Sequence, residues 1–203
     1  MATDASTAGG PWLVLGLGNP GREYAESRHN AGAMVIDLLA QRAGVKLKSH
    51  RARADIAETR IEGVRAIVAR PRSYMNESGG PAAGLMGFFR IGAEHLVAVH
   101  DEIDLAFGRI QVRFNGGDAG HNGVRSLRQS LGTGDFFRVR LGVGRPQGRQ
   151  EAADHVLRDF SSRERADLPL LLERGADAVA TLLRDGLAAA QNTYHGDLDA
   201  GLG

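Results

Sequence analysis

The chain has 203 residues, 42% hydrophobic and 24% charged, a size that supports one well-filled core. It contains no cysteine, which excludes a disulfide framework, a thiolate metal site and a cysteine nucleophile. The net charge is only +1, but residues 105–150 carry eight Arg against two Asp, whereas residues 151–203 carry ten acids against five Arg. A basic middle is typical of a polyanion-binding face, or simply reflects that arginine is this protein's usual cation.

The sequence has no internal linker, and its least regular parts are residues 1–10 and the C-terminal stretch 195–203. We predict a single catalytic domain over residues 11–195, with flexible tails over residues 1–10 and 196–203. No apolar stretch approaches the roughly 18 residues of a membrane span, and the first residues do not form a basic leader. We therefore expect a cytoplasmic monomer without a membrane partner.

Short runs with strand-like patterning recur along the chain, and helical patterns separate most of them. Strands are predicted over residues 12–18, 54–61, 64–70, 95–103, 108–114 and 136–144. Helical patterns cover residues 34–39, 85–89, 124–131 and 168–183, with Pro169 near the start of the last one. The turn near residue 62 indicates one antiparallel hairpin. This alternation predicts an α/β fold, a single-domain three-layer sandwich with a mostly parallel mixed twisted sheet and helices on both faces.

Three glycines in residues 16–21 have the GxGxxG spacing of a dinucleotide-binding loop, directly after the first predicted strand. In such a loop a helix begins at the third glycine, so that its free N–H groups face the pyrophosphate. Here Asn-Pro-Gly at 19–21 indicates a turn, and the helical pattern begins only near Ala31. We therefore predict a rigid bend that presents Asn19 and then His29, and no cofactor.

Polar clusters follow several predicted strands. In open α/β sheets ligands bind at the carboxyl ends of the strands, so loops that follow neighbouring strands meet at one rim. The clusters expected there are Asn19, Ser73–Asn76, the acids Asp101, Glu102 and Asp104, and the loop 116–123.

Two of the seven histidines, His29 and His121, stand in His-Asn motifs beside predicted helix starts. One interpretation makes Asn30 and Asn122 helix N-caps, with each histidine merely preceding the cap. The other makes His29 a general base, because imidazole accepts a proton near neutral pH and a carboxylate partner fixes its tautomer. Asp101, the first acid after its strand, is the predicted partner.

The remaining acids and the serines leave two alternatives to weigh. Glu102 and Asp104 are either surface acids or, together with Asp101, ligands of Mg²⁺; without a further ligand motif we predict no metal. The sequence has no GxSxG nucleophile elbow, and Ser78 stands at a predicted helix start, which argues against a serine hydrolase. Water activated by His29 is then the nucleophile, with asparagine amides as donors to an oxyanion.

Five blocks of sequence resemble the bacterial-type peptidyl-tRNA hydrolase family, in order and at the expected spacing, between residues 13 and 195. They are GLGNPGREYAESRHNAG, PRSYMNESG, HDEIDLAFG, GGDAGHNGVRSL and RVRLGVGRP. The resemblance implies a single-domain α/β sandwich. It also implies a metal-independent enzyme that hydrolyses the ester between a peptide, or an N-blocked amino acid, and the 3′ ribose of tRNA, and so recycles tRNA for translation.

The resemblance also implies a role for each matching residue. His29 is the general base and Asp101 its orienting acid, in agreement with the interpretation above. Asn19 distinguishes blocked from unblocked aminoacyl groups, and Asn76 stabilises the oxyanion. The resemblance also implies that Tyr24, Tyr74, Asn76 and Asn122 contact the substrate, peptidyl-tRNA, and that Arg113 and Arg140 bind its 5′ phosphate.

Four positions depart from the family pattern, and none removes a catalytic group. They are Ser27 for threonine, Tyr74 for phenylalanine, Gln111 for a basic residue and Ala119 for glycine. The alternative function is a tRNA-binding protein that keeps this fold without the chemistry. The joint presence of His29 and Asp101 argues against it, because binding alone needs no base.

Overall fold

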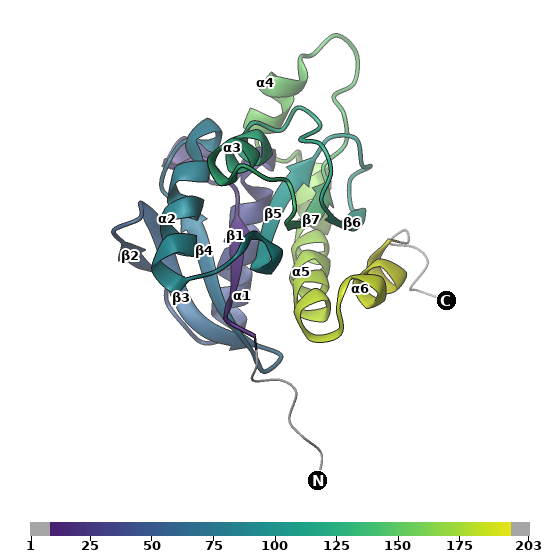
Figure 1. The fold of residues 1–203 in the computed structure, drawn as a ribbon. Coiled ribbons are helices and arrows are strands. Elements are labelled where there is room, and N and C mark those ends of the chain that lie inside the picture. Colours follow the sequence, from purple (N-terminus) through teal and green to yellow (C-terminus); the bar gives the residue numbers. More distant parts are fainter. Residues whose placement is uncertain (1–8, 196–203) are drawn as a thin grey trace.

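The computed structural model describes residues 9–195, whose regular elements form three layers (Figure 1). A seven-stranded sheet with the order β2-β3-β4-β1-β5-β7-β6 is the middle layer. Helices α2 and α3 pack on one face, and α1, α5 and α6 pack on the other. The predicted α/β sandwich is confirmed. Of the predicted tails, only residues 9 and 10 belong to the described part of the chain.

Four parallel strands make up the centre of the sheet. The strands are β1 (Trp12–Gly16), β2 (Lys48–His50), β3 (Ala54–Ile61), β4 (Val64–Pro71), β5 (Leu96–Glu102), β6 (Ile110–Phe114) and β7 (Phe137–Gly142). Strands β4, β1, β5 and β7 are parallel, whereas β2 with β3, β3 with β4, and β6 with β7 pair antiparallel. The β3–β4 pair is the predicted hairpin. Every residue of β5 is buried, as expected for a strand that is covered on both faces.

The helices are α1 (Ala31–Arg42), α2 (Gly79–Phe89), α3 (Asn122–Leu131), α4 (Ala152–Leu157), α5 (Ser162–Asp185) and α6 (Leu187–Tyr194). Short 3-10 turns occur at η1 (Arg22–Tyr24), η2 (Arg28–Asn30), η3 (Met75–Glu77) and η4 (Ala93–His95). The sequence patterns missed β2, α4 and α6, because such short elements show too little periodicity. A capping box of Ser161 and Glu164 begins α5 early, so Pro169 lies inside the helix and not near its start. Within residues 9–195, every helix is too short or too polar to cross a bilayer.

The first turn of α1 packs directly on the backbone of β1 and β5. A Cβ built on Gly32 would fall 2.0 Å from the carbonyl oxygen of Val99, and one on Gly16 would fall 2.3 Å from the carbonyl oxygen of Gly32. Gly16 therefore serves close helix–sheet packing. The turns η1 and η2 separate β1 from α1, so the predicted bend replaces the helix start that a dinucleotide loop requires.

We expect Gly32→Ala to lower the free energy of unfolding by about 3 kcal/mol, because the added methyl group overpacks a backbone contact. Gly87→Ala is the matched control: Gly87 lies in α2 with open space around its Cβ position, so alanine should raise the free energy of unfolding by about 0.5–1 kcal/mol. Urea denaturation measures both changes. Equal effects of the two substitutions would contradict the packing argument.

Candidate active site

A cleft of about 690 Å³ opens where the loops after β1, β4 and β5 meet α3 and α4. The predicted residues that line it are Asn19, Tyr24, His29, Tyr74, Asn76, Asp101 and Asn122. Arg113 and Arg140 lie outside its lining, on β6 and β7. The expectation that loops distant in sequence share one rim at the strand ends is therefore confirmed.

The carboxylate of Asp101 lies between two imidazoles at the end of β5. Nδ1 of His29 is 3.0 and 2.9 Å from its two oxygens, and Nε2 of His121 is 2.8 Å from Oδ1. The histidines come from opposite layers, since His29 lies in η2 just before α1 and His121 is the N-cap of α3. All three residues are at least nine-tenths buried.

Hydrogen bonds determine which ring nitrogens carry protons. Nδ1 of His121 accepts from the N–H groups of Gly123 (3.1 Å) and Val124 (3.3 Å), so the proton is on Nε2, which donates to Asp101. His29 presents Nδ1 to the carboxylate and donates from it, which leaves Nε2 as its proton acceptor. The three groups are close enough to ligate one metal ion, but the Nε2 proton of His121 occupies the position of that ligand atom.

Burial and charge shift the pKa values in this cluster in different directions. Burial lowers the pKa of His29, but the charge of Asp101 and the hydrogen bond to it outweigh burial and raise the pKa above its ordinary value. Burial raises the pKa of Asp101, yet the two histidines hold it well below its usual range. Burial is the main cause that holds the pKa of His100, the neighbour of Asp101 on β5, well below its ordinary value. Asp101 is therefore ionised, and His100 is neutral.

Asn19 lies in the loop after β1, and hydrogen bonds from other segments hold both its backbone and its side chain. Oδ1 of Asn30 accepts from the Asn19 N–H group (2.8 Å), and Nδ2 of Asn30 donates to the Asn19 carbonyl (2.9 Å). Oδ1 of Asn19 accepts from the Met75 N–H group (2.7 Å), which leaves its Nδ2 donors for a ligand. Asn30 is the N-cap residue of α1, as one interpretation predicted, but its side chain makes no capping hydrogen bond. For α3 that interpretation is wrong, because His121 rather than Asn122 is the N-cap.

The three clustered acids do not converge on a Mg²⁺ site. Asp101 contacts histidines, Asp104 pairs with Arg145 (2.5 Å), and Glu102 pairs with Arg140 (2.5 Å). Glu102 is only 4% exposed, so its interpretation as a surface acid is wrong. Its ion pair with Arg140 fixes a cation beside the cleft.

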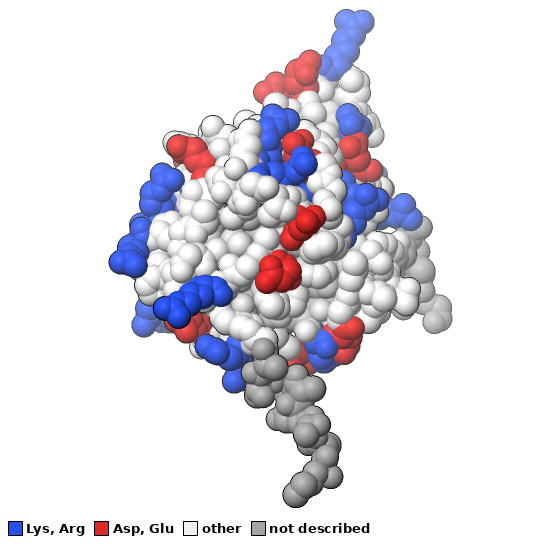
Figure 2. Space-filling model, viewed as in Figure 1, with Lys and Arg blue, Asp and Glu red and all other residues white. Residues whose placement is uncertain are grey.

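Arginines gather on one face of the β6–β7 pair. The register places Arg113 beside Arg138 and Gln111 beside Arg140. Arg140 donates to Gln111 as well as to Glu102, whereas Arg113 is exposed and pairs with no carboxylate in residues 9–195. Burial and the neighbouring arginines lower the pKa of Arg138 to about 10, as expected in a strongly positive field. Figure 2 shows blue side chains over this part of the molecule, near α3 and β6 of Figure 1.

The structure gives roles to two residues near the rim of the cleft: His121, which the sequence singled out by its motif without assigning a role, and Arg138, which sequence reasoning missed. Arg138 donates to the carbonyl groups of Gly116 and Gly117 and so holds the loop before α3. In that loop Ala119 has φ 50°, a left-handed conformation that costs an L-residue about 1–2 kcal/mol. The repeated His-Asn motif was the signal for His121. No pattern in the sequence indicates that Arg138 contacts the carbonyl groups of two loop glycines.

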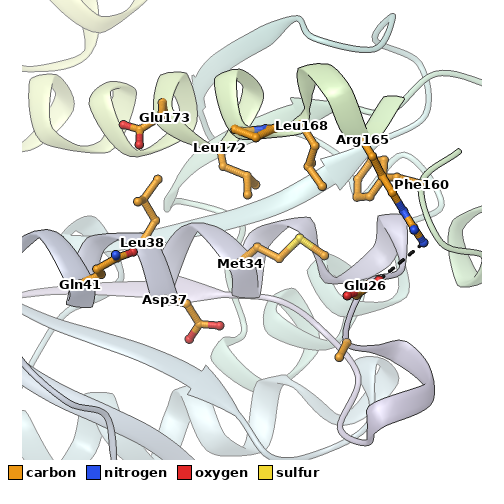
Figure 3. A pocket seen from close by; sticks show the side chains of 12 residues that line it. Glu26, Met34, Asp37, Leu38, Gln41, Phe160, Arg165, Leu168, Leu172 and Glu173 are labelled. Carbon is orange, nitrogen blue, oxygen red and sulfur yellow. Dashed lines mark ion pairs between the residues drawn. The ribbon is translucent and has the colours of Figure 1, made fainter. Parts of the chain in front are cut away.

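A second hollow, of about 570 Å³, lies between α1 and α5. Figure 3 shows Met34, Leu38 and Leu168 directed into it, with Glu26 and Arg165 paired at its edge (3.5 Å). Its lining offers apolar carbon and paired charges. The cleft that contains the His29–Asp101 pair is therefore the candidate active site.

The fold and the cleft define an α/β enzyme with a histidine–carboxylate pair. The peptidyl-tRNA hydrolase family model matches residues 13–200, and the chain belongs to this family. Peptidyl-tRNA hydrolases of Frankia casuarinae and Frankia alni are 59% and 58% identical to it over 93% and 95% of this chain, and 96% and 98% of theirs. The crystal structure of peptidyl-tRNA hydrolase from Acinetobacter baumannii superposes with a TM-score of 0.86 at 32% identity, over 92% of this chain and 95% of that one.

The pKa directions predict how the histidines titrate. His29 should stay protonated to a higher pH than a free imidazole, whose pKa is about 6.5, and His100 should become protonated only at a pH well below that of a free imidazole. Asp101→Asn removes the charge that stabilises the imidazolium, so it should lower the pKa of His29. Histidine-ring NMR over pH 4–9 measures both values. An unchanged pKa of His29 in Asp101→Asn would contradict this electrostatic coupling.

Proposed function

We propose that the protein hydrolyses the ester bond between the peptide and the 3′ ribose of peptidyl-tRNA, with His29 as the general base. The observation that carries this proposal is the direct contact between Nδ1 of His29 and the buried carboxylate of Asp101. Relatives at 58–59% identity that are named peptidyl-tRNA hydrolase support the choice of substrate.

The reaction starts with the neutral form of His29. Its Nε2 takes a proton from a water molecule as the water oxygen attacks the ester carbonyl carbon. The carbonyl oxygen becomes an oxyanion, and the ionised carboxylate of Asp101 stabilises the imidazolium. The bond from the carbonyl carbon to the 3′ oxygen then breaks, and Nε2 returns its proton to that oxygen. No step uses a metal ion or a cofactor.

Amide donors stabilise the charge that develops on the ester oxygen. Asn76 is exposed on η3 at the cleft and donates to the oxyanion, an interaction worth about 2.7–4 kcal/mol for a well-placed donor. Asn19 uses its free Nδ2 to distinguish blocked from unblocked aminoacyl groups. Tyr24, Tyr74 and Asn122 contact the acceptor end, where the 56% exposure of Tyr74 leaves its ring available for a base.

We further propose that the enzyme acts as a monomer in the cytoplasm. All residues assigned to the reaction come from one chain, so a monomer suffices for catalysis. Peptidyl-tRNA arises from interrupted translation, and we therefore place the activity in the cytoplasm.

Replacing His29 tests the assignment of the base. His29→Ala should lower kcat on N-acetyl-aminoacyl-tRNA by about 10²–10⁴-fold, because no other group takes the proton. Release of N-acetyl amino acid measures turnover, and thermal unfolding verifies the fold. His50→Ala, which removes an imidazole outside the cleft, is the matched control. Full activity of His29→Ala would refute the assignment, and binding without release by the wild type would favour the non-catalytic tRNA-binding alternative.

The arginine cluster is proposed to hold the 5′ phosphate of tRNA. Arg113 contacts the phosphate directly, since it has no carboxylate partner among residues 9–195, and Arg140 adds charge from its fixed position beside Glu102. These contacts place the substrate without reading its sequence.

Removing the guanidinium of Arg113 should weaken only the contact with phosphate. Arg113→Ala is expected to raise KM about tenfold for 5′-phosphorylated substrate, the size of one lost charge-assisted contact. It should change KM little when the 5′ phosphate has been removed enzymatically. Arg60→Ala on β3, at the other side of the sheet, is the control. The same KM change with both substrates would show that Arg113 does not contact this phosphate.

A further inference from the structure

Arg28 precedes His29 in η2, and its guanidinium is committed to a distant part of the chain. Nε and Nη2 donate to the carboxylate of Glu164 at 3.3 and 2.6 Å, in the first turn of α5. Nη1 donates to the carbonyl groups of His155 (3.1 Å), Arg158 (3.3 Å) and Asp159 (2.9 Å), at the end of α4 and just after it. The side chain of Arg28 is 8% exposed.

The backbone of η2 is attached to the same segment. The Arg28 N–H group donates to the Arg158 carbonyl (3.1 Å), and Ser27 forms an isolated β-bridge with Asp159. Glu164 also accepts from the Ser161 N–H group (2.6 Å), so the carboxylate that binds Arg28 is fixed by the start of α5. The turn that carries the proposed base is therefore joined by main chain and side chain to the connection between α4 and α5.

Helix α4 supplies an apolar wall of the cleft. Ala152, Ala153, Val156 and Leu157 line it, and Ile103 extends the wall from the loop after β5. The helix has six residues and no side-chain N-cap, so it depends on tertiary contacts for its stability. Among the described elements, η2 makes the most extensive contacts with α4.

We propose that Arg28 is a positioning residue that holds the apolar wall of α4 at a fixed distance from His29, and that this wall binds the apolar side chain of the residue esterified to tRNA. The inference rests on the proposed function of the cleft. His29 keeps its contact with Asp101, and Asn19 keeps its bonds to Asn30, without any help from the guanidinium. Arg28 therefore acts on substrate binding rather than on proton transfer.

Arg28→Lys tests the inference because it keeps the positive charge and cannot reach Glu164 and three carbonyl groups at once. Hydrogen exchange of residues 152–158 should become about tenfold faster as α4 detaches. KM for N-acetyl-leucyl-tRNA should rise about tenfold, the scale of one or two lost methylene contacts, with KM for N-acetyl-glycyl-tRNA and kcat nearly unchanged. Arg165→Lys, next to Glu164 but paired with Glu26 and Asp159 at 3.5 Å, is the matched control and should behave as wild type.

Unchanged exchange over 152–158, or an equal KM rise for both substrates, overturns the inference, because a general loss of stability does not discriminate between acyl groups. If Arg28→Lys fails to fold, Glu164→Gln carries the test, and it should move both measurements in the same direction by about threefold. Exchange needs no turnover. An inactive wild type would therefore refute the proposed function, while the exchange data would still show whether Arg28 anchors α4.

Discussion

The site depends on one buried carboxylate. Asp101 is 2% exposed at the end of a central parallel strand, where an isolated charge would cost several kcal/mol. Two imidazoles from opposite layers compensate it, and each precedes a helix that packs on its own face of the sheet. Because Asp101 must satisfy both at once, it fixes the N-terminal ends of α1 and α3 relative to β5. The need to satisfy this buried carboxylate with hydrogen bonds therefore also aligns the loops around the cleft.

Backbone contacts give this arrangement its rigidity. A Cβ on Gly32 would collide with the backbone of β5, and one on Gly123 would fall 2.5 Å from Sδ of Met75, so both helices begin in places that only glycine fits. The same Met75 donates its N–H group to Asn19. Close packing thereby joins His29, Asp101 and Asn19 into one unit, and the open carboxamide of Asn19 is held ready for a ligand at little further entropic cost.

Three kinds of surface surround the imidazole, and each suits a different part of the proposed substrate. Amide donors of Asn19 and Asn76 suit the reacting carbonyl group, the apolar wall of α4 suits an acyl side chain, and the arginines of β6 and β7 suit phosphate. The second hollow, between α1 and α5, has no such histidine–carboxylate pair in its lining. Arg28 joins two of the surfaces, because its main chain leads into His29 and its guanidinium binds the segment after α4. Such a connection lets a short helix contribute to a cleft without a large core of its own.

The sequence by itself determined the layers and the identity of the chemical groups. Apolar strands alternating with amphipathic helices predict the sandwich, because both patterns are local consequences of side-chain direction. His29 and Asp101 could be predicted as a pair because few other groups suit proton transfer, and the resemblance to a known family added the asparagines. Only the tertiary structure decided that His121 shares Asp101, that Glu102 is buried against Arg140, and that Arg28 holds α4. Each of these facts depends on contacts between residues 20 to 136 positions apart, and pairing over such separations is set by how the layers pack, which leaves no periodic trace along the chain.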